Sequence, residues 1–406
     1  MSETASAHIP PPSRDISRKA AIVGVGETDF GLDYKAARAK TPGYEPPTPE
    51  RLAKMAFERA LTDSGLKAKD IDGLATSFIY GGPDPKSTAE MLGLTPRYLT
   101  KNGNIMAGPL PVVCADIAAG KCDTVAMIYA AASRAIGRQY GGQTYVGGQG
   151  GPSSYYYHHP WGWSSQAAHW AMIFRHYQTT YGISDDDLGA VAVQVRKHAM
   201  ANPNAIMRNP MSLEDYVASR YIVRPIRLFD LCLVNDGAVC LIVRRADKAR
   251  DLPHAPVLVA GWGEAKVAHS KMHFMVRERL SAQMQEAGAQ ALAMAGIGLG
   301  EVKHFEAYDP STIHLINQVE GYGFVEPGTG LAFCKDGQMA VGGKLPVNTG
   351  GGNLSGAYMH GWSQVAEIAR QLRHEAGARQ IKGVEISMFS LATSDEAHPL
   401  LFVREA

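Results

Sequence analysis

The chain has 406 residues, enough for a large buried core and more than one average domain needs. Forty Lys and Arg residues balance thirty-nine Asp and Glu, so the charge gives no indication of nucleic acid or an anionic membrane as a partner. The five cysteines form no Cys-x-x-Cys pair, which predicts neither a disulfide framework nor a metal site. No stretch resembles a signal peptide or a membrane helix, so we expect a cytoplasmic protein.

The N-terminal part starts with a polar, proline-containing stretch, residues 1–19, which we expect to be a flexible tail. A strand is predicted at 19–25, a helix at 49–64 and a second strand at 73–78. This alternation favours an α/β fold with helices covering mixed or parallel sheets. Gly24 and Gly26 suggest a dinucleotide site at first, but Asp29 occupies the third glycine position and the fingerprint is incomplete.

An insertion at 131–229 follows this first half. Its segment 141–163 combines glycines with tyrosines and tryptophans, a composition that fits either a mobile wall for a large apolar substrate or a surface loop covered by a partner subunit. Residues 185–202 have apolar side chains at helical spacing. Residues 230–243 are typical of a turn followed by a buried strand.

The second half repeats the first in weaker form. The pattern at 21–27 returns at 257–264, and that at 60–71 returns at 291–302 in the same order, which indicates two related halves. Strands are predicted again at 256–261 and 303–307, with a helix at 279–295 between them. The predicted division is a tail at 1–19, a first half at 20–130 plus 230–250, the insertion at 131–229, and a second half at 251–406.

A glycine-rich loop near the C-terminus is the most informative feature. After an apolar lead-in, residues 348–360 read Asn-Thr-Gly-Gly-Gly-Asn-Leu-Ser-Gly-Ala-Tyr-Met-His, and a helical pattern follows. Glycines let the backbone approach a ligand and leave amide groups free near a helix start, where an anion or a developing oxyanion is well held. Gly350, Gly351 and Gly352 are therefore candidate oxyanion donors, although glycine content alone fits an ordinary tight loop equally well.

The order of residues in this loop resembles the C-terminal active-site loop of the thiolase superfamily, and most closely its sterol-carrier-protein branch. The resemblance extends over most of the chain and implies the thiolase-like five-layered α-β-α-β-α fold with duplicated halves. Thiolases place a catalytic histidine in this loop, and the matching position here is Tyr358. This departure bears directly on the chemistry.

The cysteines that thiolases use are also missing. The nucleophile would precede Gly108 at the start of a central helix, where this chain has none, and Cys114 lies deeper in the predicted helix, where a small buried hydrophobic residue is expected. The second catalytic cysteine, near the C-terminus, is replaced by the sequence at 384–393. Without a thiolate to carry an acyl group, the two-step thiolase reaction is not expected.

Tyr308 ends a predicted strand at another position that thiolases use for catalysis. Tyrosines at 308 and 358 resemble the pattern of the thiolase-like aldolases that shorten steroid side chains. That resemblance implies Tyr308 and Tyr358 as the catalytic acid and base, in an order that the sequence leaves open. A phenol with a pKa near 10 needs help to act as a base, and Asp309 and His360 are the candidate helpers. Buried aromatic residues with satisfied hydroxyl groups are the plainer alternative.

We therefore expect a retro-aldolase that cleaves a bulky 3-hydroxyacyl-CoA, from a steroid or similar intermediate, into a short acyl-CoA and a ketone or aldehyde. No metal, lysine Schiff base or other cofactor is expected, because the thioester itself accepts the electrons. The alternatives are a thiolase or acyltransferase that uses an unrecognised cysteine, and a catalytically silent lipid-carrier subunit. The resemblance also implies a homodimer that binds a smaller OB-fold protein.

Overall fold

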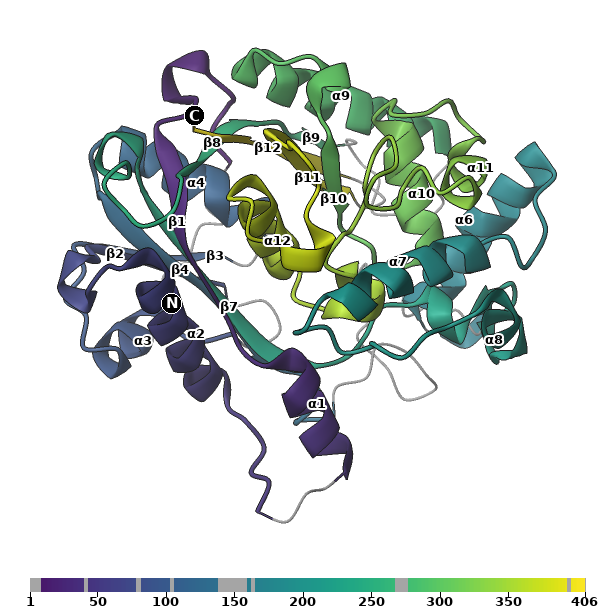
Figure 1. Cartoon of the computed structure of the whole chain (residues 1–406), viewed down its shortest axis with the longest axis horizontal. Helices are drawn as coiled ribbons and strands as arrows, with labels where there is room; N and C mark the ends of the chain where they lie inside the picture. The colour runs from purple at the N-terminus through teal and green to yellow at the C-terminus, as the bar shows by residue number, and fades with distance from the viewer. Residues whose placement is uncertain are drawn as a thin grey trace.

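The computed structural model describes residues 9–39, 43–77, 82–102, 106–137, 159–161, 165–266, 277–392 and 396–405. Ten strands form one mixed sheet, which runs across the molecule in Figure 1. The strands of this sheet are β1 (Ala20–Glu27), β2 (Gly73–Ser77), β3 (Tyr98–Asn102), β4 (Thr124–Ala132), β7 (Asp236–Arg245), β8 (Val257–Trp262), β9 (Ala265–Lys266), β10 (His304–Ala307), β11 (Ile386–Ala392) and β12 (Glu396–Arg404).

The order of the strands confirms the duplication. The sheet runs β10-β11-β12-β8-β1-β7-β4-β2-β3, with β9 added beside β12. In the first half β1 is antiparallel to β7, β7 antiparallel to β4, and β4 parallel to β2. The second half repeats these relations with β8, β12, β11 and β10. The halves meet where β1 pairs with β8, at Ala21–Leu258 and Ile22–Val257.

Helices pack around the sheet, and those of the two halves correspond in two places. The helices are α1 (Phe30–Ala39), α2 (Pro49–Ser64), α3 (Pro85–Met91), α4 (Pro109–Ala118), α6 (Gln166–Tyr181), α7 (Gly189–Ala201), α8 (Leu213–Ala218), α9 (Arg277–Ala295), α10 (Thr312–Gly321), α11 (Gly330–Lys335) and α12 (Trp362–Leu372). α2 packs on β1 and β7 as α9 packs on β8 and β12, while α4 and α12 both contact β1 and β7.

Alternation along β1 separates two apolar clusters. Ala21 and Val23 join the cluster that includes α2 and α9, while Ala20 and Ile22 join the cluster that includes α4 and α12. Successive side chains of a strand point to opposite faces of the sheet, so both faces of this one are buried. This arrangement agrees with the thiolase-like layered fold expected from the sequence.

The repeated Gly-x-Gly pattern has a packing role in each half. A Cβ atom at Gly26 would lie 2.0 Å from the carbonyl oxygen of Ala56 in α2, and one at Gly263 would lie 2.0 Å from that of Ala287 in α9. The glycines therefore let the outer helix lie directly on the strand. This close approach explains the motif without a nucleotide, in agreement with the incomplete fingerprint.

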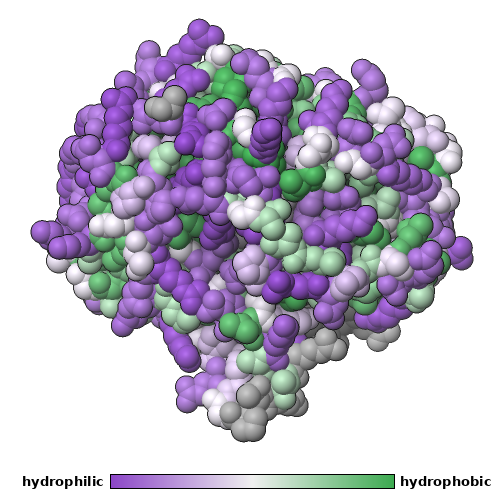
Figure 2. Space-filling view, in the orientation of Figure 1, coloured by the Kyte–Doolittle hydropathy of each residue, from purple (hydrophilic) through white to green (hydrophobic). Residues whose placement is uncertain are grey.

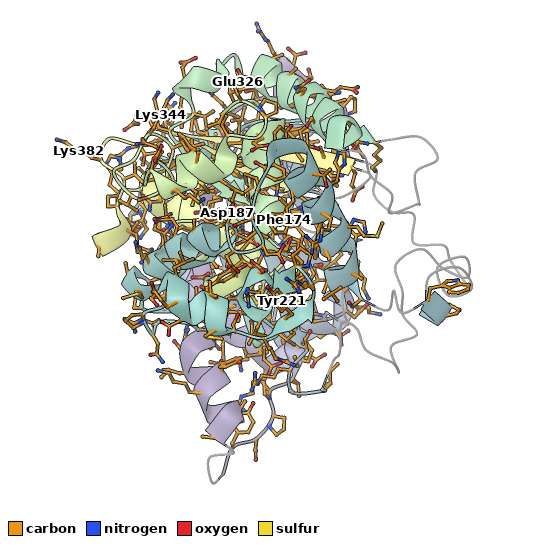
Figure 3. All side chains as sticks on the ribbon, turned by 90° about the vertical axis from the view of Figure 1, so that its right-hand side faces the viewer. Phe174, Asp187, Tyr221, Glu326, Lys344 and Lys382 are labelled. Atoms are coloured by element: carbon orange, nitrogen blue, oxygen red, sulfur yellow. The ribbon has the colours of Figure 1, made fainter. Side chains whose placement is uncertain are left out.

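The insertion packs onto the second half. The hydroxyl group of Tyr177 in α6 donates to Glu320 in α10 at 2.6 Å, and Lys335 in α11 pairs with Asp187 at 2.5 Å. Figure 3 turns this side toward the viewer, with Phe174 and Asp187 near its centre. β5 (Tyr221–Val223) and β6 (Ile226–Arg227) form a separate two-stranded sheet in the insertion. The segment expected at 141–163 lies outside the described residues except for 159–161.

The expected flexible tail needs a correction over residues 9–19. Ile9 is buried, the carbonyl oxygen of Pro10 accepts a hydrogen bond from the Trp262 indole at 2.8 Å, and Arg14 donates to the carbonyl oxygen of Ala293. The polar composition of this stretch concealed these contacts, because each hydrogen bond joins a side chain to a backbone carbonyl in a distant part of the chain.

The face shown in Figure 2 is mostly polar, with hydrophobic residues scattered over it. Among the helices within the described ranges, none is both long enough and apolar enough to cross a bilayer.

Candidate active site

The two tyrosines predicted as catalytic lie in direct contact. The hydroxyl oxygens of Tyr308 and Tyr358 are 2.8 Å apart, and their rings lie with centroids 6.3 Å apart. Both residues are buried, at 7% and 8% exposure. Two loops that are fifty residues apart in the sequence thus bring two phenols within one hydrogen bond of each other.

Backbone hydrogen bonds fix each tyrosine. Tyr308 follows β10, and its N–H donates to the carbonyl oxygen of Ser390 at 2.8 Å, while its own carbonyl oxygen accepts from the Gln318 side chain at 2.7 Å. The N–H of Tyr358 donates to the side-chain oxygen of Asn235 at 2.7 Å. These bonds restrict both backbones, so the contact between the hydroxyl groups is built into the fold.

His360 lies beside the tyrosine pair. Its ring centroid is 4.4 Å from that of Tyr358 and 6.4 Å from that of Tyr308, nearly parallel to the latter. Its backbone has a positive φ of 50°, which is uncommon outside glycine and marks a position held by its surroundings. The structure therefore brings together three of the residues named from the sequence.

Asp309 has a different setting from the one expected. Its carboxylate accepts the N–H of Asn353 at 2.8 Å and contacts the Gln364 amide at 3.3 Å. Burial raises the pKa of this carboxyl group well above its ordinary value, despite hydrogen bonds that lower it. The carboxyl group holds the glycine-rich loop, and its help to a phenol stays a prediction.

The three loop glycines are held in a tight turn. The N–H of Gly351 donates to the carbonyl oxygen of Asn348 at 2.9 Å, and Gly351 and Gly352 have positive φ values of 96° and 52°. Gly350 and Gly352 line a small polar pocket together with Glu306, Glu367 and Arg370. The amide of Gly351 is thus used within the turn, and the oxyanion role of the three glycines stays a prediction.

Asn348 joins this loop to β10. Its side-chain oxygen accepts the N–H of Ala307 at 2.7 Å, and its amide donates to the carbonyl oxygen of the same residue at 3.0 Å. The Asn348 side chain thus forms the two hydrogen bonds that a neighbouring strand would form with Ala307, at the point where the chain turns toward Tyr308. His198, which is buried in α7, contacts the Asn348 carbonyl oxygen at 3.2 Å, so the insertion also supports the loop.

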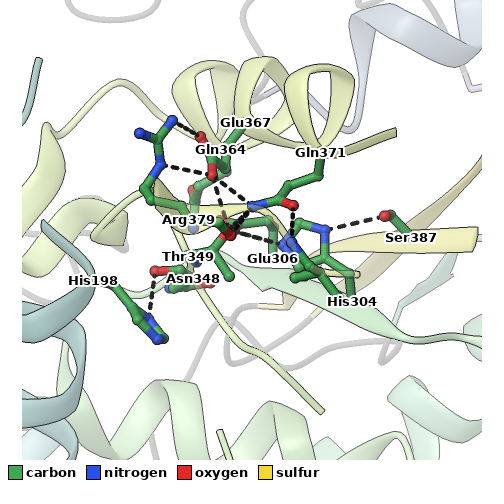
Figure 4. Close-up of polar contacts among 12 residues, drawn as sticks. His198, His304, Glu306, Asn348, Thr349, Gln364, Glu367, Gln371, Arg379 and Ser387 are labelled. Carbon is green, nitrogen blue, oxygen red and sulfur yellow. Dashed lines mark hydrogen bonds and ion pairs between the residues drawn. The ribbon is translucent and has the colours of Figure 1, made fainter. Parts of the chain in front are cut away.

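A buried ionic network lies behind the loop (Figure 4). Thr349 donates its N–H to Glu306 at 2.7 Å and its hydroxyl to Glu367 at 3.0 Å. Arg379 forms two hydrogen bonds with Glu367, at 3.0 and 2.8 Å. Burial alone would raise the pKa of Glu367, but the hydrogen bond and charge of Arg379 outweigh it and lower this pKa to about 2. The carboxylate is therefore charged and anchored at neutral pH.

His304 extends the network on the other side of Thr349. Its ring contacts Glu306 at 3.0 Å and the Ser387 hydroxyl at 3.1 Å. Burial raises the pKa of Glu306 above its ordinary value, against the opposing effect of His304. Sequence reasoning missed this network, together with Asn235 and Gln318. The adjacency of Thr349 to the glycines was the only signal in the sequence, because the other members come from distant segments.

The cysteines lack the properties of a nucleophile. Cys114 is 1% exposed inside α4, as expected, and burial raises the pKa of its thiol. Burial likewise raises the pKa of Cys122, Cys232 and Cys334 to about 12, and that of Cys240 above its ordinary value. A reactive cysteine needs a lowered pKa, so a thiolate mechanism has no support in these thiols.

Comparison with known proteins gives the same family as the fold and site. A family model described as "Thiolase C-terminal domain-like" matches residues 265–393. The chain is 34% identical to a steroid side-chain-cleaving aldolase of Thermomonospora curvata, over 87% of this chain and 90% of that protein. It is also 34% identical to the 17-hydroxy-3-oxo-4-pregnene-20-carboxyl-CoA lyase of Mycobacterium tuberculosis, over 93% of this chain and 97% of that protein.

Comparison with solved structures gives the same fold. The chain superimposes on a structure titled Ltp2-ChsH2(DUF35) aldolase with a TM-score of 0.82, at 29% identity, over 96% of this chain and 98% of that one. Human mitochondrial 3-ketoacyl-CoA thiolase shares the fold, with a TM-score of 0.68 at 14% identity over 96% and 99%. The chain belongs to the thiolase superfamily. Within it, the chain is a member of the branch that contains these aldolases.

Proposed function

We propose that the chain is a carbon–carbon lyase that cleaves a bulky 3-hydroxyacyl-CoA by a retro-aldol reaction. The contact between the Tyr308 and Tyr358 hydroxyl groups, 2.8 Å apart in a buried site, carries this proposal. Where a thiolase uses a cysteine thiolate, this site has two hydroxyl groups that can transfer protons. The names of the two relatives at 34% identity support a steroid acyl group as the substrate.

The reaction needs two proton transfers. One phenol, acting as its phenolate, removes the proton of the β-hydroxyl group, the bond between the α and β carbons breaks, and the β carbon becomes a ketone or aldehyde. The electron pair of that bond forms the enolate of the thioester, which takes a proton at its α carbon. Because the two phenol oxygens share a hydrogen bond, a proton accepted by one tyrosine can be passed to the other, which then protonates the carbon.

The other parts of the site support these steps in the proposal. His360 stacks beside both phenols, the glycine-rich loop supplies amide groups for the enolate oxygen, and Asp309 holds that loop. The thioester is the electron sink, so we propose no additional cofactor. Coenzyme A enters and leaves as part of the substrate and the product.

We also propose a homodimer that binds a smaller OB-fold protein. Among the described residues β3 pairs only with β2, and Leu99 on β3 is 45% exposed; a free strand edge of this kind is a template for pairing with another chain. Trp161, in the described part of the segment 141–163, is 84% exposed and suits a surface that a partner covers. The solved structure at TM-score 0.82 is titled as an assembly with a DUF35 protein.

Single-atom substitutions test the mechanism. Tyr308→Phe and Tyr358→Phe should each lower kcat at least ~10²-fold, the usual contribution of a positioned acid or base. The assay follows the short acyl-CoA and the ketone by mass spectrometry, with a steroid 3-hydroxyacyl-CoA as substrate. Tyr322→Phe is the matched control, because Tyr322 is also buried and bonded to a hydroxyl group, that of Ser390, at 2.7 Å.

Three outcomes would contradict the proposed mechanism, its control or the proposed assembly. Near-wild-type turnover in both catalytic variants, with folded protein, would show that the tyrosine mechanism is wrong. Loss of turnover in the Tyr322 control to the same degree would show that the assay reports packing instead of proton transfer. A chain that is a monomer by light scattering and fully active alone would contradict both the homodimer and the partner.

A further inference from the structure

The helix that follows Tyr308 is unusual in its burial. All ten residues of α10 are buried, the polar ones included. A buried polar side chain has lost its water and needs a partner inside the protein. The hydrogen bonds of α10 therefore show which of its polar side chains have a partner inside the protein and which do not.

Several polar side chains of α10 have such partners. Thr312 donates to Asp230 at 2.7 Å, Glu320 accepts from Tyr177 at 2.6 Å, and the Gln318 amide nitrogen donates to the carbonyl oxygen of Tyr308 at 2.7 Å. These bonds join α10 to the insertion and to the catalytic tyrosine, which accounts for their burial.

Asn317 has none, and His314 has only the backbone of Ala392 within hydrogen-bonding reach. In the part of the chain that the structure describes, both polar atoms of the Asn317 amide and the amide oxygen of Gln318 are buried without a hydrogen bond, and neither ring nitrogen of His314 has a side-chain partner. The three residues are 1%, 4% and 0% exposed. Residues three and four apart lie on the same side of a helix, so these orphaned groups are neighbours.

Two other buried histidines near the site are well bonded. His198 contacts the carbonyl oxygen of Asn348 and the amide of Gln194, and His304 contacts Glu306 and Ser387. The fold thus satisfies these two imidazoles. An unsatisfied buried group lowers stability, so several of them on one helical turn need an explanation other than folding.

The position of the cluster suggests that explanation. The His314 ring packs edge-on against Tyr308, with centroids 6.1 Å apart, and against Trp170 of α6, with centroids 4.7 Å apart. The His314 ring therefore lies between a catalytic phenol and an indole that offers an apolar surface, and Asn317 is one helical turn away on the same side of α10. A ligand with an apolar body and a polar oxygen atom matches this combination.

The charge of the cluster narrows the choice of ligand. Burial lowers the pKa of His314 to about 4, against the smaller opposing effect of a hydrogen bond to the backbone of Ala392. The imidazole is thus neutral at pH 7. With its N–H directed to that carbonyl group, its second nitrogen can accept a hydrogen bond, and the Asn317 amide offers both donors and an acceptor. Neutral groups of this kind match a hydroxyl or carbonyl oxygen better than a carboxylate or a phosphate.

We propose that His314 and Asn317 form a substrate-recognition site that hydrogen-bonds an uncharged oxygen of the acyl group, beside the bond that Tyr308 and Tyr358 cleave. The inference rests on the proposed aldolase function and names the residues that select its substrate. It predicts that these two side chains contribute more to affinity than to stability. Replacement by leucine should therefore weaken substrate binding with little loss of stability.

The test uses His314→Leu and Asn317→Leu in the full chain. Asn317→Leu should leave the melting temperature unchanged or higher, because it removes orphaned polar groups, and His314→Leu should lower it less than His304→Leu does. Each should weaken binding of a steroid 3-hydroxyacyl-CoA about 10-fold, the size expected from one lost hydrogen bond to the ligand. His304→Leu is the contrast, because its imidazole is bonded, and it should lower the melting temperature.

Calorimetric binding in a Tyr308→Phe background removes turnover from the measurement. Comparison with the same acyl-CoA lacking the β-hydroxyl group then identifies the oxygen. If His314→Leu weakens only the hydroxylated ligand, the site binds the β-oxygen, and if it weakens both, the site binds the thioester or another acyl oxygen. Unchanged binding of both ligands, or a lower melting temperature with unchanged binding, would overturn the proposal.

These outcomes are independent of the proposed reaction. Wild-type protein that binds the acyl-CoA but does not cleave it would contradict the aldolase function and leave the binding result standing. Wild-type protein that cleaves the substrate, while both leucine variants bind it normally, would contradict only the recognition site.

Discussion

Removal of Arg379 should destabilise the protein strongly at neutral pH and much less in acid. Arg379 and Glu367 are 6% and 3% exposed at the side chain. Within the described residues, Arg379→Met would leave a charged carboxylate in the interior with Thr349 and Gln371 as its side-chain donors. Loss of one partner of a buried pair costs about 3–5 kcal/mol. The pKa of Glu367 gives a second value for comparison.

The free energy obtained from the pKa of Glu367 agrees in size with this cost. The pKa of Glu367 falls from 4.5 to about 2 in the folded protein, and at about 1.4 kcal/mol per pH unit this difference is worth roughly 3 kcal/mol. Because the folded-state pKa is the lower one, this contribution is complete above pH 4.5 and is lost as the pH falls from there toward 2. The gap between Arg379→Met and wild type should therefore be widest near pH 7 and narrow below pH 4.5.

Urea unfolding at pH 7 and at pH 4 measures both differences. The double variant Arg379→Met/Glu367→Gln should recover part of the loss, because it also removes the buried charge. Arg250→Met is the exposed control: Arg250 pairs with Glu405 but is 73% exposed at the side chain, so its loss should cost at most about 1 kcal/mol. An Arg379 variant no less stable than the Arg250 control would refute the reasoning.

Three further outcomes are expected. Iodoacetamide should leave turnover unchanged, and Cys114→Ala should keep activity at a cost of about 1 kcal/mol in unfolding free energy, because that thiol is buried and its pKa is raised; inactivation that acyl-CoA prevents would restore the thiolase alternative. Asn235→Ala should lower kcat more than it lowers stability, because Asn235 holds the backbone of Tyr358; an unchanged kcat would show that this bond does not position the phenol. Gly26→Ala should destabilise the fold, as measured by urea unfolding.

The sequence predicted those parts of the fold that depend on local pattern. The helix predicted at 49–64 is α2, Pro49–Ser64, because apolar spacing, a threonine N-cap and a proline in the first turn all lie within it. The helix predicted at 185–202 is α7, Gly189–Ala201. The duplicated order of elements was visible because each half keeps the same glycines.

The contact between the tyrosines could be expected only through the resemblance. Nothing near Tyr308 or Tyr358 in the sequence indicates that the other is close. The buried network behind the tyrosines was harder still to predict, since its members Glu306, Thr349 and Glu367 come from a strand, a loop and a helix. A charged residue in a helix pattern is normally solvated, and the burial of Glu367 follows only from the packing of α12 between elements of both halves.

The glycine pairs explain why two halves of such different sequence keep the same architecture. An alanine at Gly26 would place its Cβ 2.0 Å from the Ala56 carbonyl oxygen, so α2 must move away from β1, and overpacking of this kind costs about 1–3 kcal/mol. A Cβ at Gly263 would lie 2.0 Å from the Ala287 carbonyl oxygen in α9, so Gly263→Ala should be equally destabilising. Gly300→Ala should be neutral, because a Cβ there meets nothing within 4 Å. A Gly26 variant as stable as the Gly300 control would show that the close packing of helix on strand does not determine this fold.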